Sequence, residues 1–575
     1  MDYTIKIGGE AGQGIQTIGE TLGRVFARSG FHVFSNQDYE SRIRGGHNFY
    51  QIRLSHRPLA ASRDKVDIIV AFDSESITRH EHELTMNGRI IYDATALKFK
   101  KEDPVFLEIA FEKLALEQGG DKIMANTVAT GAVLGMLGMG LDIFLDLIAE
   151  AFKNKGDHVV DANRNAAQAG YQYARQHCDP NTFAVAAGEI KQRMLIGGIE
   201  AIALGALSAG CRFYAAYPMT PSTGIMNYLA AKAGEYGLIV EQAEDEIAAI
   251  NMALGASFAG VRAMTGTSGG GFALMAEGLS LAGMTETPIV IAMGQRPGPA
   301  TGFPTRTEQG DLEFILSAGH GEFPRVVFAP GTPDQALYLT NKAFDLAEKY
   351  QIPAFVLFDT SLADSQWTVD SFDLSRLRYQ DYRLRGDAFK NQLDYKRYSS
   401  TDTGVSPLAV PGDASHVVVV DSDEHDEEGH IIEDAATRIR MVEKRLFKKL
   451  PLIRSEIAPP DLYGDQDAHV VLTGWGSTYG VMKEAVDELA KSMRIAMLHF
   501  GEIFPLPDLA RFDYVAFLTK AKLSLCIEHN ATGQFGRLLR AETGFEFKTR
   551  INRYDGRPFT VEELMGEIHG HLGNI

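Results

Sequence analysis

Three consecutive carboxylates, Glu244, Asp245 and Glu246, stand just before a long stretch of small and apolar residues. Acidic residues at a helix start accept hydrogen bonds from unpaired backbone N–H groups and complement the positive end of the helix dipole. That role explains the acid, but it does not explain a carboxylate that faces the interior. An inward carboxylate would be a group for proton transfer.

A threonine between prolines follows the apolar segment "CRFYAAYP". Pro218 and Pro221 restrict the backbone on both sides of Thr220, and Tyr217 precedes them. The carboxyl end of a strand is the edge where open α/β sheets bind ligands. An ordinary turn, with Ser222 starting the next helix, accounts for the same residues.

The segment "AMTGTSGGGFALMAEG" has the pattern of a strand, a glycine loop and a helix. Glycines 269 to 271 would allow a ligand ring to approach the backbone closely. The Lys-Ser/Thr pair of a nucleotide-binding P-loop is missing from the segment, which argues against a nucleoside triphosphatase.

A second loop, "GQRPGPATGFPTRTEQGDLEF", is rich in proline and glycine and carries Arg296, Arg306 and Glu308. A guanidinium held in a stiff loop suits bidentate binding of a carboxylate. A single arginine in a loop is usually a surface residue, but one between Pro304-Thr305 and Glu308 is less often so.

Near the N-terminus, "GGEAGQGI" follows a strand and opens a helix, as either a tight turn or a phosphate site. Farther on, Arg42, Arg44 and His47 surround the pair Gly45-Gly46. These residues form either a solvated basic loop or a loop that closes on an anionic substrate or on coenzyme A.

Composition narrows the classes of function. The 575 residues carry a formal net charge of −19, and the pI is about 5.3. Such acidity argues against nucleic acid or an anionic membrane as the main partner. No apolar run approaches the roughly 18–20 residues of a membrane span, and no charged-then-apolar leader opens the sequence. We therefore expect a cytoplasmic enzyme.

Metal binding is not expected from this chain. Its three cysteines lie far apart, so neither a disulfide framework nor four-cysteine ligation of an iron–sulfur cluster is predicted. The loop "DEHDEEGH" contains His425, Asp426 and His430, but their spacing fits no helix-borne zinc motif. Acidic loops of this kind are usually solvated.

Strand-like and helix-like segments alternate along most of the chain, which predicts an α/β fold with doubly wound, mostly parallel sheets. We expect α/β domains at 1–185, 186–375 and 466–575. Residues 376–465 read as a polar connector with little strand signal. Within it, "AATRIRMVEKRLFKKL" (435–450) predicts a helix.

Four segments together resemble one family: "YPMTPST", "EDEIAAINMALGASFAG", "TGTSGGG" and "RPGPATGFPTRTEQGD". They look like the α subunit of 2-oxoacid:ferredoxin oxidoreductases, most like the 2-oxoglutarate type with a γ domain fused at the N-terminus. "GGEAGQGIQTIGE" and "RIRGGHN" match that γ domain, and "DEHDEEGH" and "EHNATGQFGRLLR" match later segments. The resemblance covers nearly the whole chain. "GGIEAIALGA" departs from the usual "GNEA" and keeps Glu200 as the recognisable residue.

The resemblance implies a γ domain, a domain that binds the pyrimidine ring of thiamine diphosphate, and a transketolase C-terminal-like domain. It points to Glu246 as the carboxylate at N1′ of the ring, with Glu244 and Asp245 in the ordinary helix-start role. Thr220 resembles the residue beside the reacting carbonyl, and Arg306 the one that binds the 2-oxoacid carboxylate. The cofactor contacts that it implies besides Glu246 are Tyr217, Pro218, Thr267, Ser268, Gly269 and Gly270.

The implied reaction is CoA-dependent oxidative decarboxylation of 2-oxoglutarate to succinyl-CoA and CO₂, with electrons passed to ferredoxin, or its reductive reverse. Pyruvate and branched-chain 2-oxoacids are alternatives within the same chemistry, and a non-catalytic scaffold that binds coenzyme A or a nucleotide is the alternative from another class. 2-Oxoglutarate needs a second cationic site for its distal carboxylate, for which Arg44 and His47 are candidates.

The chain lacks both a "GDG" segment followed by Asn and a Cys-x-x-Cys pair. In the family, a β subunit carries these motifs, and with them Mg²⁺ and a [4Fe-4S] cluster. The resemblance therefore implies half an active site, completed by a β partner in an (αβ)₂ assembly with thiamine diphosphate across the interface.

Overall fold

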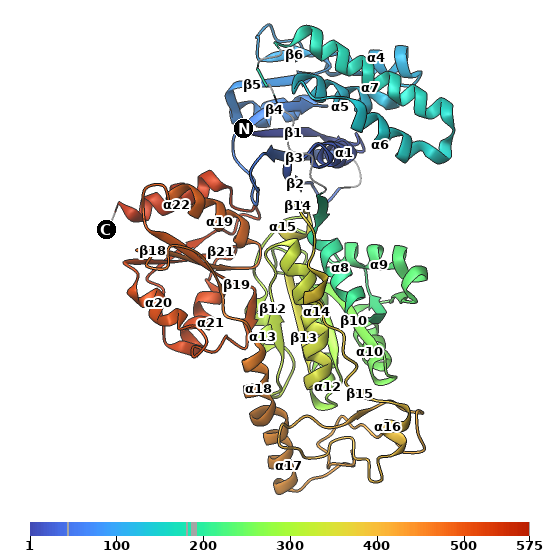
Figure 1. The fold of residues 1–575 in the computed structure, drawn as a ribbon, viewed down its shortest axis with the longest axis vertical. Coiled ribbons are helices and arrows are strands. Elements are labelled where there is room, and N and C mark those ends of the chain that lie inside the picture. Colours follow the sequence, from blue (N-terminus) through green and yellow to red (C-terminus); the bar gives the residue numbers. More distant parts are fainter. Residues whose placement is uncertain (43–44, 180–181, 184, 186–192, 574–575) are drawn as a thin grey trace. The chain divides into compact units, whose positions relative to one another are not determined.

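The computed structural model describes residues 1–575 except 43–44, 180–181, 184, 186–192 and 574–575 (Figure 1). The chain divides into two compact units. Unit 1 comprises Met1–Ile196, Asp364–Phe372 and Phe559–Ile575, and unit 2 comprises Gly197–Ala363 and Asp373–Pro558.

An eight-stranded sheet forms the centre of unit 1, in the order β6-β5-β4-β1-β3-β2-β14-β7. Its strands are β1 (Asp2–Ala11), β2 (His32–Asp38), β3 (Gly45–Ser55), β4 (Val66–Ala71), β5 (Leu84–Tyr92), β6 (Phe106–Glu108), β7 (Met194–Gly197) and β14 (Ser365–Val369). β1, β4, β5 and β6 run parallel, whereas β3 is antiparallel to both β1 and β2. This antiparallel half departs from the mostly parallel sheet expected, because a short connection joins β2 directly to β3.

Two segments from far along the chain complete unit 1. β14 pairs antiparallel with β2, Ser365 opposite Asn36. Helix α22 (Val561–Leu572) begins with a capping box, in which Thr560 and Glu563 each accept a hydrogen bond from the other's backbone. The contiguous range 1–185 expected from the sequence includes neither segment.

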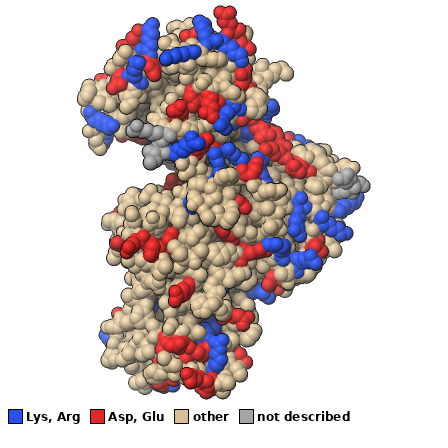
Figure 2. All heavy atoms as spheres, turned by 180° about the vertical axis from the view of Figure 1, so that it is seen from behind, with Lys and Arg blue, Asp and Glu red and all other residues tan. Residues whose placement is uncertain are grey.

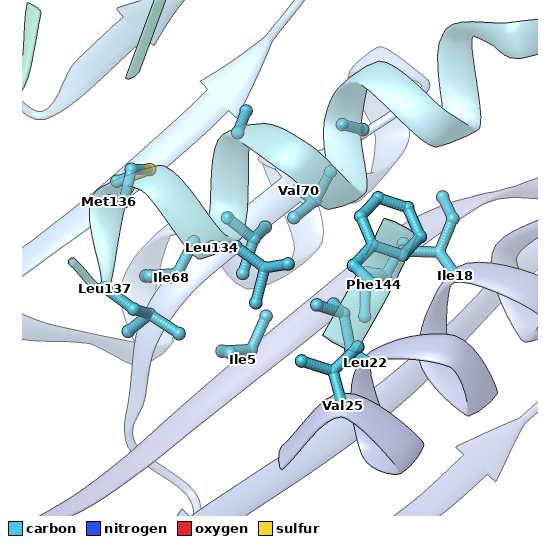
Figure 3. Close-up of a cluster of buried hydrophobic side chains, with 14 of the residues drawn as sticks. Ile5, Ile18, Leu22, Val25, Ile68, Val70, Leu134, Met136, Leu137 and Phe144 are labelled. Carbon is cyan, nitrogen blue, oxygen red and sulfur yellow. The ribbon is translucent and has the colours of Figure 1, made fainter. Parts of the chain in front are cut away.

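Helices cover the sheet of unit 1 and bury its core. They are α1 (Ile15–Arg28), α2 (Ser74–His80), η1 (Glu81–Glu83), α3 (Ala94–Leu97), α4 (Phe111–Leu114), η2 (Ala115–Gly119), η3 (Lys122–Met124), α5 (Ala125–Met136), α6 (Asp142–Phe152), η4 (Lys153–Lys155) and α7 (Asp157–His177). Figure 3 shows strand side chains such as Ile5 and Val70 meeting Leu22 of α1, Leu134 of α5 and Phe144 of α6.

Close packing of α5 on α7 depends on glycine. A methyl group at Gly131 would collide with the carbonyl of Ala167, and one at Gly170 with the carbonyl of Val128. The two backbones therefore approach more closely than side chains would allow.

Unit 2 holds a seven-stranded sheet in the order β20-β12-β13-β11-β10-β8-β9. Its strands are β8 (Cys211–Ala216), β9 (Ile239–Gln242), β10 (Arg262–Ser268), β11 (Ile289–Gln295), β12 (Val326–Phe328), β13 (Pro353–Asp359) and β20 (Glu502–Phe504). All but β20 run parallel. Helices of this part are α8 (Gly198–Ser208), α9 (Thr223–Tyr236), α10 (Glu246–Phe258), α11 (Gly269–Leu274), α12 (Ala276–Met284), α13 (Leu312–Ser317), α14 (Pro333–Tyr350) and α15 (Thr360–Ala363).

A five-stranded sheet in the order β17-β19-β18-β21-β22 forms the other layered part of unit 2. Its strands are β17 (Asp461–Gly464), β18 (Val470–Trp475), β19 (Ile495–Phe500), β21 (Leu523–Glu528) and β22 (Thr549–Asn552), and its helices α19 (Thr478–Leu489), α20 (Tyr514–Lys520) and α21 (Gln534–Thr543). The α/β class expected from alternating segments is confirmed in all three large sheets.

Between β14 and β17 the chain has little strand, and β17 itself, inside the range 376–465 expected as a connector, belongs to the five-stranded sheet. The stretch between β14 and β17 contains η5 (Leu374–Arg376), β15 (Arg383–Leu384), α16 (Gly386–Lys390), β16 (Leu408–Ala409), α17 (Ala435–Val442), η6 (Glu443–Lys448) and α18 (Lys449–Glu456). The helix predicted over 435–450 is therefore present and runs on to Glu456, with the π-helical η6 in its middle. Lys444 and Lys449 of this helix bind the buried carboxylate of Glu286.

Acidic and basic side chains are interspersed over the face shown in Figure 2, with broad uncharged areas between them. Among the residues that the structure describes, none of the helices is both long and apolar enough to cross a membrane.

Candidate active site

The three carboxylates that precede α10 have three different environments. Asp245 is the N-cap, and its carboxylate accepts a hydrogen bond from the backbone N–H of Ala248 at 2.7 Å. Glu244 is exposed, whereas Glu246, the first helical residue, is only 4% exposed. Its Oε1 is buried and has no hydrogen-bond partner among the described residues. Glu246 is thus the inward carboxylate.

The glycines expected to form a loop after β10 instead form the first turn of α11, and this turn packs against Glu246. Thr267 and Ser268 are completely buried at the end of this strand, and the Ser268 hydroxyl has no hydrogen-bond partner among the described residues. A methyl group at Gly271 would collide with Thr267 Oγ1 and Glu246 Oε1. Gly270, by contrast, is exposed. Glycine is therefore required where this turn meets the buried carboxylate.

Thr220 lies after β8, at the carboxyl edge of the parallel sheet. Its backbone carbonyl accepts a hydrogen bond from Arg296 Nη1 at 3.0 Å, and Arg296 Nη2 also contacts the sulfur of Met219. Ser222 donates to the Met219 carbonyl at 2.7 Å and leaves α9 without a side-chain cap. Arg296 thus ties this loop to the loop that carries Arg306, while Tyr217 remains exposed.

The loop with Arg306 is fixed by buried amide groups. Gln309 donates to the Trp475 carbonyl at 2.8 Å and accepts from the backbone N–H of His529 at 3.0 Å. The backbone N–H of Thr307 donates to the Gly556 carbonyl at 3.2 Å. Arg306, which is partly buried, is therefore presented by a loop held between the seven-stranded and five-stranded sheets of unit 2. No local pattern in the sequence indicates that Gln309 is an anchor of this loop.

Asp311 was also missed by the sequence analysis. A methyl group at Gly269 would lie 2.7 Å from Oδ1 and 2.9 Å from Oδ2 of Asp311, so this carboxyl group packs against the same glycine turn. Burial, with a contribution from Glu308, raises the pKa of Asp311 to about 6, and Arg296 opposes that rise. Its position at the start of an apolar helix gave no indication that the side chain turns inward.

The proposed second cationic site belongs to unit 1. Arg44 lies outside the described residues. His47 is 6% exposed, and its Nε2 lies 2.8 Å from Nε2 of His80. Burial and the neighbouring His80 lower the pKa of His47 to about 4, which favours a neutral imidazole at pH 7. The prediction that His47 binds a carboxylate as a cation therefore gains no support from its surroundings.

The acidic loop near His430 is held by internal contacts. The ring of His425 is buried and stacks 3.9 Å from the ring of Tyr398, between centroids. Asp426 accepts hydrogen bonds from the backbone N–H groups of Glu428 and His430. Across the described ranges, no group of three or more His, Cys, Asp or Glu residues is placed to hold a metal ion.

Unit 2 thus brings together the side chains of Glu246, Thr267 and Asp311 around one glycine turn, and Arg296 links the loops of Thr220 and Arg306. An inward carboxylate without a partner can accept a hydrogen bond from a ligand nitrogen or exchange a proton with it. A guanidinium on a fixed loop can orient a carboxylate.

Comparison with known proteins identifies the family to which these domains belong. Residues 204–444 match the family model described as pyruvate flavodoxin/ferredoxin oxidoreductase, thiamine diP-bdg. Residues 4–173 match the model described as pyruvate ferredoxin/flavodoxin oxidoreductase.

Relatives match over almost the full chain. The 2-oxoacid:ferredoxin oxidoreductase subunit alpha of Sulfolobus sp is 32% identical over 98% of this chain and 96% of its own length. The 2-oxoglutarate synthase subunit KorA of Methanocaldococcus jannaschii is 34% identical over 65% of this chain and 98% of its own. A solved structure of 2-oxoglutarate:ferredoxin oxidoreductase from Magnetococcus marinus, with 2-oxoglutarate, coenzyme A and succinyl-CoA bound, is 32% identical and covers 99% of both chains with a TM-score of 0.91. The fold, the glycine turn and these matches agree, and the chain belongs to the family of 2-oxoacid:ferredoxin oxidoreductase α subunits.

Proposed function

We propose that this chain is the α subunit, with a fused γ domain, of an enzyme that decarboxylates 2-oxoglutarate oxidatively to succinyl-CoA and CO₂ and passes the electrons to ferredoxin. Family membership supports the general reaction. The preference for 2-oxoglutarate is supported by two relatives, the KorA subunit and the Magnetococcus marinus enzyme with 2-oxoglutarate bound. Pyruvate or a branched-chain 2-oxoacid would use the same chemistry.

The observation that carries the proposal is the buried, unpartnered Oε1 of Glu246 beneath Gly271. A buried polar atom without a partner is costly unless a ligand completes it. A ring nitrogen of the aminopyrimidine of thiamine diphosphate fits this requirement. When bound, thiamine diphosphate supplies the carbon nucleophile for the 2-oxo group and holds the electrons left when CO₂ departs.

Within this scheme, each residue of the chain has one task. Glu246 holds a proton between its carboxyl group and the ring nitrogen, which activates the cofactor. The backbone around Gly269 and Gly270 gives the ring room to approach, next to Thr267 and Ser268. Arg306 orients the carboxylate of the 2-oxoacid, and Thr220 lies beside its carbonyl.

An uncharged surface next to Glu246 supports a partner subunit. The exposed positions of α10 are Ile247, Asn251, Met252, Gly255 and Phe258, none of which is charged. Leu274 at the end of α11 is also exposed. Apolar exposed surface of this kind marks protein–protein contact. We propose that a β subunit covers it and supplies Mg²⁺, the diphosphate site and a [4Fe-4S] cluster, in an (αβ)₂ assembly.

The test is viologen reduction by the protein purified anaerobically with its partner, with 2-oxoacid and coenzyme A both required. Turnover with 2-oxoglutarate at a kcat/KM at least tenfold above that for pyruvate supports the whole proposal. Turnover confined to pyruvate or branched-chain acids would support the proposed reaction type and refute 2-oxoglutarate as its substrate. No turnover with any 2-oxoacid, by an assembled and cofactor-loaded complex, would overturn the function.

A further inference from the structure

Asp311 occupies the N-cap position of α13 but does not cap the helix. An aspartate at this position normally accepts a hydrogen bond from a backbone N–H two or three residues later. Other aspartates at N-cap positions in the described chain do so, namely Asp73, Asp93, Asp121, Asp245, Asp373, Asp434 and Asp513. The side chain of Asp311 is therefore used for something else.

The carboxyl group of Asp311 points into the candidate active site. It packs against Gly269, and its Oδ2 is buried without a hydrogen-bond partner among the described residues. The backbone is held in this orientation, because the N–H of Asp311 donates to Oε1 of the buried Gln295 at 3.1 Å. Asp311 and Glu246 thus flank one glycine triad, each with an oxygen that no described residue satisfies.

Burial, modified by two charged neighbours, sets the protonation state of Asp311. The guanidinium of Arg296, which also binds the Thr220 carbonyl, favours the carboxylate form of Asp311, whereas Glu308 disfavours it. Burial outweighs Arg296 and raises the pKa of Asp311 to about 6. Burial also raises the pKa of Glu308. A 2-oxoacid anion entering this site adds negative charge, and Asp311 is placed to relieve it by protonation.

We propose that Asp311 binds the 2-oxoacid directly, taking up one proton from solvent as the anion binds and donating its O–H to a substrate oxygen. The proposal rests on the proposed function and adds a binding group to it. No covalent bond changes in this step. The proton is released again when the product leaves, so Asp311 acts as a binding residue whose charge is coupled to substrate charge.

The proposal has a clear pH signature. Below pH 6 free Asp311 is already protonated, and binding needs no proton. Above pH 6 each binding event must take up one proton from solvent, so KM for 2-oxoglutarate should rise by up to about tenfold per pH unit between pH 6 and 8. The carboxyl groups of the substrate titrate near or below about 4.3 and do not contribute in this range.

The experiment measures KM and kcat of the assembled enzyme for 2-oxoglutarate from pH 6 to 8, in wild type and Asp311→Asn. Asparagine is nearly isosteric, stays neutral and keeps an N–H donor. We expect its KM to change by less than about twofold over this range and to match that of wild type at pH 6. Asp311→Glu, which remains titratable, should retain the pH-dependent KM. It keeps the proposal testable if Asp311→Asn fails to fold.

Glu308→Gln is the matched control, because it removes a carboxylate from the same loop. We expect it to keep the pH-dependent rise of KM. A wild-type KM that is constant with pH, or an Asp311→Asn variant with the wild-type slope, would overturn the inference while turnover itself upholds the proposed function. Loss of the slope in Glu308→Gln alone would assign the proton to Glu308 and also overturn it. Absence of any 2-oxoacid turnover in wild type would overturn both proposals.

Discussion

Asp245 and Glu246 are neighbouring carboxylates on one helical turn, yet the fold gives them opposite environments. Asp245 accepts a hydrogen bond from the backbone of its own helix, whereas Glu246 packs against Gly271 with one oxygen that no described residue satisfies. Asp245 therefore stabilises its helix. The buried carboxylate of Glu246 lowers the stability of the ligand-free protein, and a bound ligand offsets that loss. The two positions therefore allow a matched pair of substitutions.

Glu246→Gln should lower kcat about 10²- to 10⁴-fold, because the amide cannot exchange a proton with the ring nitrogen. The complex should still assemble, and its melting temperature should stay the same or rise, because a buried unpaired carboxylate is replaced by a neutral group. Asp245→Ala should affect stability rather than turnover: the free energy of unfolding should fall by about 1 kcal/mol, and kcat should change little. Viologen assays and thermal melts measure both, and near-normal turnover of Glu246→Gln would refute its role.

Arg306→Leu should raise KM for every 2-oxoacid while thiamine diphosphate affinity is preserved. Loss of charge-assisted hydrogen bonds to a carboxylate costs about 1.5–3 kcal/mol, or about 10- to 150-fold in KM. Arg306→Lys keeps the positive charge but loses the bidentate geometry, so its KM should lie between that of wild type and that of the leucine variant. An unchanged KM in the leucine variant would remove Arg306 from the substrate site.

Some of these residues could be identified from the sequence, and others could not. The family resemblance pointed to Glu246, whose burial the structure shows, but nothing local distinguishes an aspartate that caps from one that turns inward. Asp245 and Asp311 both precede apolar helices, and only tertiary contacts with Gly269 and Gln295 separate them. Gln309 was missed because its partners, Trp475 and His529, lie more than a hundred residues away.

Among the helices and strands, those with a local sequence signal could be predicted, whereas those defined by contacts with distant segments could not. Apolar runs such as β11, which is buried along its whole length, and the helix starting at Ala435 could be predicted because their signals are local. β14 could not, because it belongs to unit 1 only through pairing with β2, more than three hundred residues earlier. The loop between β11 and α13 is likewise defined by its distant anchors, which makes its rigidity testable.

Gln309→Ala should loosen this loop without touching the substrate. The Trp475 carbonyl and the His529 N–H would each lose a buried partner, at a cost of about 1–3 kcal/mol in the free energy of unfolding. Arg306 would be held less firmly, so KM for the 2-oxoacid should rise more than kcat falls. Gln16→Ala, which removes an exposed side-chain bond to Glu20, is the control and should change neither. Equal KM values for the two variants would show that the anchor does not position Arg306.

At the scale of the whole molecule, the connector is joined to the seven-stranded part of unit 2 by a buried charge cluster. The carboxylate of Glu286, between α12 and β11, forms ion pairs with both Lys444 and Lys449. All three side chains are almost completely buried. Breaking a buried ion pair leaves an uncompensated charge, which is far more costly than losing a surface pair.

Glu286→Gln should therefore destabilise unit 2 by about 3–5 kcal/mol, because two buried ammonium groups lose their counter-charge together. Glu150→Gln breaks the exposed pair with Arg28 and should cost far less, because solvent screens an exposed pair. Chemical denaturation followed by far-UV circular dichroism compares the two. The triple variant Glu286→Gln/Lys444→Met/Lys449→Met should recover most of the loss, since it removes the charges as a set. If it recovers none, the cost of Glu286→Gln lies in packing, and the cluster does not hold the connector by charge.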